Sequence, residues 1–371
     1  MRVVILSKAL VVGQYQKKLE ELARHSDLEL TVIVPPCWRD ERGSVPLERA
    51  YTRGYTLLVE PLRLNGHFHW HYYPTLPKIL ARVRPDLVHI DEEPYNLATF
   101  LALRAARRSG AKTLFFTWQN ILRHYPPPFA WMEAYVLQHS DYAIAGNAEA
   151  VRVLRAKNYR GGVQVLPQFG VDPDLFHPIA ESIHPPTSPA TFCIGGGVGR
   201  WVEEKGIDLL LRAVAGLEGD WEVRLVGSGP AQSQLQALAR KLGIAARVHF
   251  DSPRPSIEMP AYYASLDVFV MSSRTRPNWK EQFGRALVEA MASGVAVIGS
   301  DCGEIPNVIG DAGLLFREGD VDALRAHLVA LRDDPARRSV LGQRGRARVL
   351  AHFTHARIAQ ETYAVYREIV V

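Results

Sequence analysis

The sequence has few cysteines and no closely spaced pair of them. Cys37, Cys193 and Cys302 are far apart, and no C-x-x-C occurs in the 371 residues. This spacing argues against a disulfide framework and against a cysteine-based zinc site. We therefore expect a protein of a reducing compartment, the cytoplasm.

Long apolar runs are also lacking. No stretch approaches the roughly 18 apolar residues that a membrane-spanning helix requires. The opening residues, MRVVILSKAL, have neither the apolar core nor the small-residue cleavage site of a secretory signal, so they predict a buried strand. With 47% apolar and 22% charged residues, the composition is that of an ordinary soluble globular protein.

Acidic residues are scarce in the first half of the chain. Residues 1–170 hold 22 Lys and Arg against 15 Asp and Glu, whereas residues 171–371 hold 22 against 24. A basic half suits an anionic membrane surface or a phosphorylated acceptor. An Arg-rich composition without functional meaning is the simpler explanation. No nucleic-acid-binding motif accompanies the charge, so we expect no nucleic acid partner.

Short apolar runs of strand length alternate with amphipathic helical segments along the whole chain. This alternation, present in both halves, predicts two α/β domains with parallel sheets. The predicted strands are residues 3–6, 28–34, 57–60, 87–90, 113–117, 142–145 and 163–166 in the first half, and 190–194, 222–226, 248–250, 268–271, 295–299 and 313–316 in the second.

The boundary between the domains is predicted at the Pro-rich, aperiodic residues 167–190. We expect an N-terminal domain of residues 1–170, a C-terminal domain of residues 171–354, and a final helix of residues 355–371 that packs back toward the N-terminal domain. Ligands of such folds bind at the carboxyl ends of the strands, here in a cleft between the domains.

A glycine-rich turn precedes one predicted helix, in CIGGGVGRWVEEKGIDLLLRAV. It is not a dinucleotide fingerprint, because Arg200 and Val202 stand where the last glycine is needed, and no P-loop occurs. Two cations, Arg200 and Lys205, flank the helix start and can hold a diphosphate there. A plain strand-to-helix turn with solvated charges is the alternative. A second glycine turn, RLVGSGP, is a weak and usually structural signal by itself, but it gains weight because it belongs to the same predicted sheet.

Two carboxylates frame the start of a later helix, in NWKEQFGRALVEAMASGVAVIGSDCGEIP. Glu281 and Glu289 would be about 12 Å apart and within about 80° of one direction if the segment were helical throughout. Carboxylates accept hydrogen bonds from vicinal hydroxyls, and the amides of Phe283 and Gly284 are donors at the helix start. Two diols that flank a diphosphate describe a nucleotide sugar.

These motifs together resemble those of the retaining family 4 glycosyltransferases, in the glycogen synthase and phosphorylase superfamily. The resemblance rests on the Glu-x7-Glu pair, GRWVEEKG, the GVDPDLF linker and VIGSDCGEIPNVIGDAGLLF, and it covers essentially the whole chain. It implies the GT-B fold, an α/β architecture of two Rossmann-like doubly wound domains that face each other across a cleft.

The resemblance also implies roles for the residues. Arg200 and Lys205 hold the donor diphosphate, Glu289 holds the ribose, and Glu281 holds the sugar together with the Phe283 and Gly284 amides. The segment DSPRPSIEMP, around Arg254, runs alongside the nucleobase, and the backbone at Gly13 approaches the phosphates. The further donor-binding positions are Gly13, Gly199, Gly227 and Arg254.

The expected chemistry needs no metal and no cofactor, because fixed cations and helix termini stabilise the leaving nucleoside diphosphate, of UDP or GDP type. The two D-x-D sequences, at residues 172–174 and 320–322, are interpreted as a turn and a helix cap. Glu281 and Glu289 are too far apart for the roughly 5 Å carboxylate pair of retaining glycosidases, so we favour same-face attack by the acceptor.

The N-terminal domain departs from the family pattern. The histidine that many members carry after a strand is missing from TLFFTWQNILRHYPPP, where Asn120 or Gln119 can replace it and His124 follows. Glu92 or Glu93, in DEEPYN, can orient an acceptor. In NGHFHWHYYP, alternate histidines lie on one side of an extended chain. A metal site, an aromatic acceptor loop or a plain surface loop are the possibilities, and the plain loop is the simplest.

We therefore expect a cytoplasmic hexosyltransferase, with retention of configuration, that acts on a glycan or lipid-linked acceptor and contacts the inner membrane face peripherally. A sugar-nucleotide epimerase of the same fold and a catalytically silent nucleotide-sugar-binding protein are the alternatives.

Overall fold

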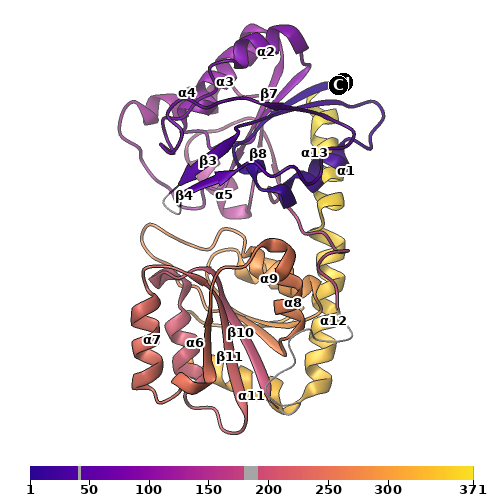
Figure 1. Ribbon diagram of the computed structural model, residues 1–371. Helices are drawn as coiled ribbons and strands as arrows, with labels where there is room; N and C mark the ends of the chain where they lie inside the picture. Colours follow the sequence, from indigo (N-terminus) through magenta and orange to yellow (C-terminus); the bar gives the residue numbers. More distant parts are fainter. Residues whose placement is uncertain (41–42, 179–190, 371) are drawn as a thin grey trace. The chain divides into compact units, whose positions relative to one another are not determined.

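The computed structural model describes residues 1–40, 43–178 and 191–370 (Figure 1). Contacts divide the chain into two compact units. The first unit is Met1–Gly170 with His355–Val371, and the second is Val171–Thr354. Within the described ranges, no helix is long and apolar enough to cross a membrane.

The first unit is built on a parallel sheet of seven strands in the order β5-β2-β1-β6-β7-β8-β9. Strands after β1 are first added on one side of it and then, from β6 onward, on the other, so the carboxyl ends of β1 and β6 form the topological switch point of this sheet. The strands are β1 (Arg2–Leu6), β2 (Glu29–Val34), β5 (Thr56–Val59), β6 (Leu87–Ile90), β7 (Lys112–Thr117), β8 (Tyr142–Ala145) and β9 (Gly162–Val165).

Helices cover both faces of this sheet because successive strand residues point to opposite sides. Val4 and Leu6 of β1 pack on one face, and Val3 and Ile5 on the other. Full burial of each such side chain contributes about 1.5–3 kcal/mol. The helices are α1 (Lys17–Leu22), α2 (Leu76–Val83), α3 (Leu97–Arg108), α4 (Phe129–His139), α5 (Ala148–Ala156) and α13 (His355–Val370).

The first unit also contains a hairpin that the sequence did not predict. Strands β3 (Cys37–Asp40) and β4 (Gly43–Pro46) pair in antiparallel fashion. Their sequences, CWRD and GSVP, contain a proline and polar residues without a clear apolar alternation. The pattern on which strand prediction depends is therefore missing there.

The second unit has a parallel sheet of six strands in the order β12-β11-β10-β13-β14-β15, with its switch point between β10 and β13. The strands are β10 (Phe192–Arg200), β11 (Trp221–Ser228), β12 (Val248–Asp251), β13 (Val268–Met271), β14 (Ala296–Ser300) and β15 (Leu314–Phe316). The helices are α6 (Ile207–Val214), α7 (Gln232–Lys241), α8 (Met259–Ala264), α9 (Arg285–Ala292), α10 (Ile305–Ile309), α11 (Val321–Asp333) and α12 (Pro335–His352).

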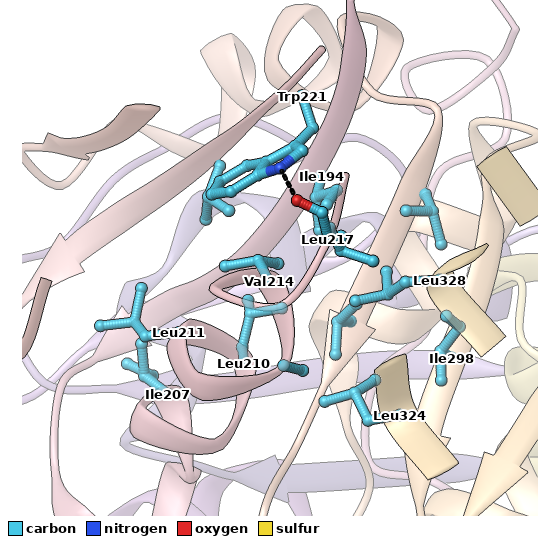
Figure 2. Packing of buried hydrophobic residues seen from close by; sticks show 14 of the residues in the cluster. Ile194, Ile207, Leu210, Leu211, Val214, Leu217, Trp221, Ile298, Leu324 and Leu328 are labelled. Carbon is cyan, nitrogen blue, oxygen red and sulfur yellow. Dashed lines mark hydrogen bonds between the residues drawn. The ribbon is translucent and has the colours of Figure 1, made fainter. Parts of the chain in front are cut away.

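One face of the second sheet carries a dense apolar core (Figure 2). Leu210 and Val214 of α6 and Leu324 and Leu328 of α11 pack there against the strands. The indole nitrogen of Trp221 is buried too, and it donates to the Leu217 carbonyl at 3.1 Å. This bond satisfies a polar group that would otherwise be costly to bury.

Every predicted strand has a counterpart, which confirms two parallel α/β halves. The largest difference concerns β10, predicted at residues 190–194, of which residue 190 lies outside the described residues. The strand continues through the glycine run to Arg200, because Gly199 and Arg200 still pair with β11 beyond a register shift after Gly196. A run of glycines is typical of a loop, but in this protein the run GGGVG is part of strand β10. Half of the predicted linker, residues 179–190, also lies outside the described part.

Candidate active site

The cluster of predicted donor-binding residues lies in the second unit, at the switch point of its sheet. Lys205 ends the short 3-10 helix η3 (Glu203–Lys205), which follows β10. The next residue, Gly206, has φ +61°, and a Cβ there would lie 1.9 Å from the Ser272 carbonyl oxygen. Only glycine permits this close approach, which brings Lys205 beside the loop that follows β13.

Lys205 and Glu281 form an ion pair. Lys205 Nζ lies 2.6 Å from Glu281 Oε2, and Ser273 Oγ donates to the same oxygen at 3.2 Å. Lys205 Nζ also lies 4.9 Å from the centre of the Trp279 ring. Glu281 is buried, whereas the Lys205 side chain is 26% exposed. A cation suited to phosphate and a carboxylate suited to sugar hydroxyls therefore lie in direct contact.

The backbone of Glu281 is held in place by a turn after β14. The Glu304 amide donates to the Glu281 carbonyl oxygen at 3.1 Å. Gly303 has φ +56°, and a Cβ on it would lie 2.2 Å from that oxygen. Helix α9 begins only at Arg285, after Gly284. This confirms that Glu281 precedes the helix and that Glu289 lies within it, so the spacing of about 12 Å, which holds only for a continuous helix, does not apply.

Glu289 lies on α9 and is buried, with a donor on each of its oxygens. The Tyr263 hydroxyl donates to Oε2 at 2.9 Å, and Arg285 Nε donates to Oε1 at 2.7 Å. Burial and the nearby Glu289 charge raise the pKa of Tyr263 well above its usual value. Since each carboxylate oxygen accepts about two hydrogen bonds, Glu289 retains capacity for one more on each oxygen, as a vicinal diol requires.

The other predicted donor positions follow neighbouring strands of the same sheet. Gly199 pairs with Gly227, and Arg200 pairs with Ser228, at the carboxyl ends of β10 and β11. The Arg200 side chain is exposed. Arg254 lies beyond β12, where its guanidinium contacts Asp251 at 3.0 Å. These residues lie at the carboxyl ends of their strands, on the same side of the sheet as Lys205.

Gly13 belongs to the first unit, and its amide is already engaged. The Gly13 N–H donates to Glu48 Oε2 at 2.6 Å. A Cβ at this glycine would lie 2.8 Å from the same oxygen. The expected approach of Gly13 to a phosphate stays a prediction, and in this structure a carboxylate of the same unit accepts the hydrogen bond from its amide.

Two adjacent carboxylates beyond β6 have opposite environments. Glu92 pairs with Lys8, and its Oε2 lies 3.6 Å from His71 Nε2. These partners outweigh the opposing effect of burial and lower the pKa of Glu92 to about 2. Glu93 accepts hydrogen bonds from the Trp118 amide and Thr117 Oγ1, at 2.9 and 2.7 Å. Burial dominates there and raises the pKa of Glu93 to about 7.

The candidates for the missing histidine differ in environment. Lys157 Nζ donates to the Gln119 amide oxygen at 3.0 Å, and the Gln119 amide nitrogen donates to Glu133 at 3.2 Å. Gln119 is thus part of a structural ion-pair network. Asn120 is buried, and His124 is exposed.

The histidine loop is not extended. Trp70 and His71 donate their amides to the His67 carbonyl oxygen, which folds the segment into turns. His67 is exposed whereas His71 is fully buried, so the expected alignment of His67, His69 and His71 on one side is wrong. Within residues 1–40, 43–178 and 191–370, no three His, Cys, Asp or Glu side chains are grouped to hold a metal ion.

The interpretation of the D-x-D sequences as a turn and a cap is confirmed. Asp172 Oδ1 accepts from the Asp174 amide, and Asp320 Oδ1 accepts from the Ala323 amide at the start of α11.

Four contact residues were missed by sequence reasoning, namely Ser273, Trp279, Tyr263 and Arg285. The serine pair that directly follows the apolar strand VFVM was a usable signal, because side chains after a parallel strand lie at the ligand edge. Arg285 also stands at i−4 from Glu289, which is the spacing of a helical ion pair. No comparable signal marks Tyr263.

Two family models match the chain. Residues 12–168 match "Glycosyl transferase 4-like domain", and residues 191–348 match "Glycosyl transferases group 1". The matches fall one in each unit.

Characterised relatives extend over most of the chain. A GDP-mannose-dependent alpha-(1-6)-phosphatidylinositol monomannoside mannosyltransferase of Mycolicibacterium smegmatis is 34% identical over 344 residues, which is 86% of this chain and 85% of the relative. The lipopolysaccharide core biosynthesis mannosyltransferase LpsB of Rhizobium meliloti is 27% identical over 327 residues, covering 80% and 88%.

Solved structures share the fold. Sucrose-phosphate synthase from Thermosynechococcus elongatus has a TM-score of 0.73 at 21% identity, with 99% and 98% of the two chains covered. Anabaena HepE, in complex with UDP and glucose, has a TM-score of 0.74 at 18% identity, with 99% and 100% covered. The two family models and the mannosyltransferase relative that matches 86% of the chain show the family, and the two parallel sheets show the fold. The chain belongs to the family 4 glycosyltransferases of GT-B fold.

Proposed function

We propose that this glycosyltransferase moves a hexosyl unit, with mannose as the first candidate, from a nucleoside-diphosphate sugar to a glycan or lipid-linked acceptor with retention of anomeric configuration. The observation that carries the proposal is the Lys205–Glu281 ion pair at the switch point of the second unit. The mannosyltransferase relative that is 34% identical supports the choice of sugar, and its name supports GDP-mannose as the first donor to test.

Lys205 and Arg200 are proposed to hold the diphosphate. Phosphate binding draws Lys205 toward the donor and leaves Glu281, still held by Ser273, to accept from a sugar hydroxyl. The backbone amides of Phe283 and Gly284 add donors there. As the leaving group departs, negative charge develops on its phosphate oxygens, and fixed cations stabilise that charge without reorganisation.

Glu289 is proposed to hold the ribose diol through the capacity that Tyr263 and Arg285 leave on its two oxygens. Arg254, Gly199 and Gly227 complete the donor site at the strand ends. The base lies toward Arg254, and the glycines let the donor approach the backbone.

Retention is proposed to follow because the acceptor hydroxyl attacks the anomeric carbon from the same face from which the leaving group departs. The bond between the anomeric carbon and the phosphate oxygen breaks, the acceptor oxygen bonds to that carbon, and the acceptor proton passes to the departing phosphate. Glu281 is not assigned as a nucleophile, because its proposed role is to accept a hydrogen bond from the sugar while Ser273 holds its Oε2. No metal or cofactor is assigned to the reaction.

The acceptor is proposed to use the first unit, where Glu93, Gln119, Asn120 and His124 are the candidate contacts. A lipid-linked acceptor would bring the enzyme to the cytoplasmic face of a membrane through reversible contact with anionic lipids.

The donor is tested by thermal unfolding with GDP-mannose and with UDP-, GDP- and ADP-glucose. Specific binding at about 100 times Kd stabilises a protein by about 2.7 kcal/mol. Lys205→Met should abolish this stabilisation, whereas Lys241→Met, an exposed lysine of α7 in the same unit, should retain it. Stabilisation that is equal in both variants would contradict the diphosphate site.

Chemistry is tested separately, by transfer to lipid extracts and to glycans and by proton NMR of the first product formed. An α-linked product from an α-linked donor supports retention, and a β-linked product refutes it. Donor binding without transfer or hydrolysis would favour the silent binding protein, and an epimerised nucleotide sugar would favour the epimerase.

A further inference from the structure

Exposed apolar side chains are concentrated in two segments of the first unit. Ten large apolar residues in the described part of the chain are exposed, and five of them fall in residues 64–70 and 122–131. These include every exposed phenylalanine and tryptophan of the described part. The members, which we call the aromatic patch, are Leu64 (51% exposed), Phe68 (43%), Trp70 (40%), Leu122 (48%) and Trp131 (69%).

Ring contacts join the two segments of the patch although they are far apart in sequence. The Trp70 and Phe129 ring centres lie 4.8 Å apart, and those of His69 and Phe129 lie 5.0 Å apart. His69 also contacts Tyr125, at 6.0 Å. Phe129 is the first residue of α4, the helix that carries Trp131 (Figure 1).

The patch is also anchored to the body of the unit. The His69 carbonyl oxygen accepts from the Leu97 amide at the start of α3, at 3.0 Å. The ring of Tyr95, just before α3, packs against that of Tyr125 at a centre distance of 4.4 Å and a tilt of 30°. The exposed rings are therefore presented by an ordered surface built from two loops and a helix start.

The two segments of the patch contain no acidic residue, and the acids beside them, Glu92 and Glu133, are ion-paired with Lys8 and Lys157. No Asp or Glu occurs in residues 61–85 or 94–132, which contain both segments. Arg63 and Arg123 stand next to Leu64 and Leu122, and both arginines are exposed. Exposed tryptophans together with arginines, and without acids, suit the boundary between lipid headgroups and acyl chains of an anionic bilayer.

We propose that the aromatic patch is the surface by which this enzyme docks onto anionic lipid bilayers. The tryptophans and Phe68 enter the headgroup region, and the two arginines contact lipid phosphates. The proposal deepens the lipid-linked acceptor proposed above and rests on it for its biological meaning. The measurement that tests it does not require turnover.

Docking is measured by flotation of the full chain with phosphatidylcholine vesicles, with and without phosphatidylglycerol, at low and high salt. Trp70→Ser with Trp131→Ser should weaken binding to the anionic vesicles about tenfold or more. Arg63→Ser with Arg123→Ser should weaken it and flatten the salt dependence, since each cation near such a surface contributes about fivefold. Val340→Ser with Leu350→Ser, which are equally exposed on α12 of the second unit, is the control and should bind as the wild type does.

Insertion is measured by tryptophan fluorescence with acyl-chain-brominated phosphatidylcholine in the anionic vesicles. The proposal is supported if the brominated lipid quenches the tryptophan fluorescence of the wild type and this quenching disappears in the double variant Trp70→Ser with Trp131→Ser. If the double variant unfolds at a lower temperature than the wild type, the single variant Trp131→Ser replaces it in this test. Equal vesicle binding by wild type and tryptophan variants, or no quenching, overturns it. A concentration-dependent dimer in light scattering that the tryptophan variants dissociate assigns the patch to a second copy and also overturns it.

The same samples separate this proposal from the proposed function. The tryptophan variants should keep the full thermal stabilisation by GDP-mannose. Vesicle binding through the patch in a protein that no nucleotide sugar stabilises would refute the proposed donor and leave the docking surface standing.

Discussion

Replacement of Glu93 by glutamine should remove a pH dependence of stability that the wild-type protein carries. Burial raises the pKa of Glu93 from the usual 4.5 to about 7, although hydrogen bonds from the Trp118 amide and Thr117 lower it in part. In the folded protein the carboxyl therefore remains protonated at pH values where the unfolded chain has already lost its proton.

The sign and size follow from this difference. A folded pKa above the unfolded value means that the stabilisation is complete below about pH 4.5 and is lost as the pH rises through about 7. The whole interval corresponds to about 3 kcal/mol of unfolding free energy, and about 2–3 kcal/mol of it falls between about pH 5 and about pH 8. Glutamine resembles the neutral acid, because its carbonyl can accept from the Trp118 amide and its NH2 can donate to Thr117 Oγ1.

The assay is urea unfolding of wild type and Glu93→Gln at about pH 5 and about pH 8, at equal ionic strength. The stability of the variant relative to the wild type should rise by about 2–3 kcal/mol between the two pH values. Glu29→Gln, at an exposed position of β2, is the control and should show no such change. If the difference between Glu93→Gln and wild type is the same at both pH values, the carboxyl is ionised in the folded protein and the reasoning fails.

Three further outcomes are expected. Turnover should be unchanged in EDTA, because fixed cations serve the diphosphate; activity lost in EDTA and restored by Mn²⁺ or Mg²⁺ would contradict this. Glu281→Gln should lower turnover about 100-fold while the Kd for free nucleoside diphosphate stays nearly unchanged, whereas Glu289→Ala should weaken that binding. Calorimetric titration of both variants decides this, and equal losses would refute the division of roles. Tyr263→Phe should weaken nucleoside diphosphate binding about fivefold, since it removes one hydrogen bond that orients Glu289; an unchanged Kd would show that Tyr263 does not position it.

The strands were predictable because their signal is local. Runs such as VVIL and VFVM are short, apolar and bounded by turn residues, and each forms a strand. The β3–β4 hairpin and the second half of β10 carry no such signal. Their conformation depends on a neighbouring strand, which a single segment of sequence does not contain.

The residue types of the candidate site could be predicted from the sequence, but the contacts between them could not. The residue types of Lys205, Glu281 and Glu289 indicated a nucleotide sugar. Their roles stay predictions. The contact between Lys205 and Glu281 was not foreseen, since the two residues were assigned to different parts of the ligand. The hydrogen bond between the Gly13 amide and Glu48 was not foreseen either, because Glu48 is distant in sequence.

The sequence by itself determined the alternation of strands and helices, the two parallel sheets and the residue types at the strand ends. These depend on side-chain period and length, which are properties of short segments. Only the tertiary structure decided which of those residues touch. Lys205 meets Glu281 because β10 and β13 are neighbours and Gly206 lets the chain pass the Ser272 carbonyl. Trp70 meets Phe129 because two loops converge on the start of α3 and α4. Such contacts join residues far apart in the chain, so their geometry is set by packing and not by any local pattern.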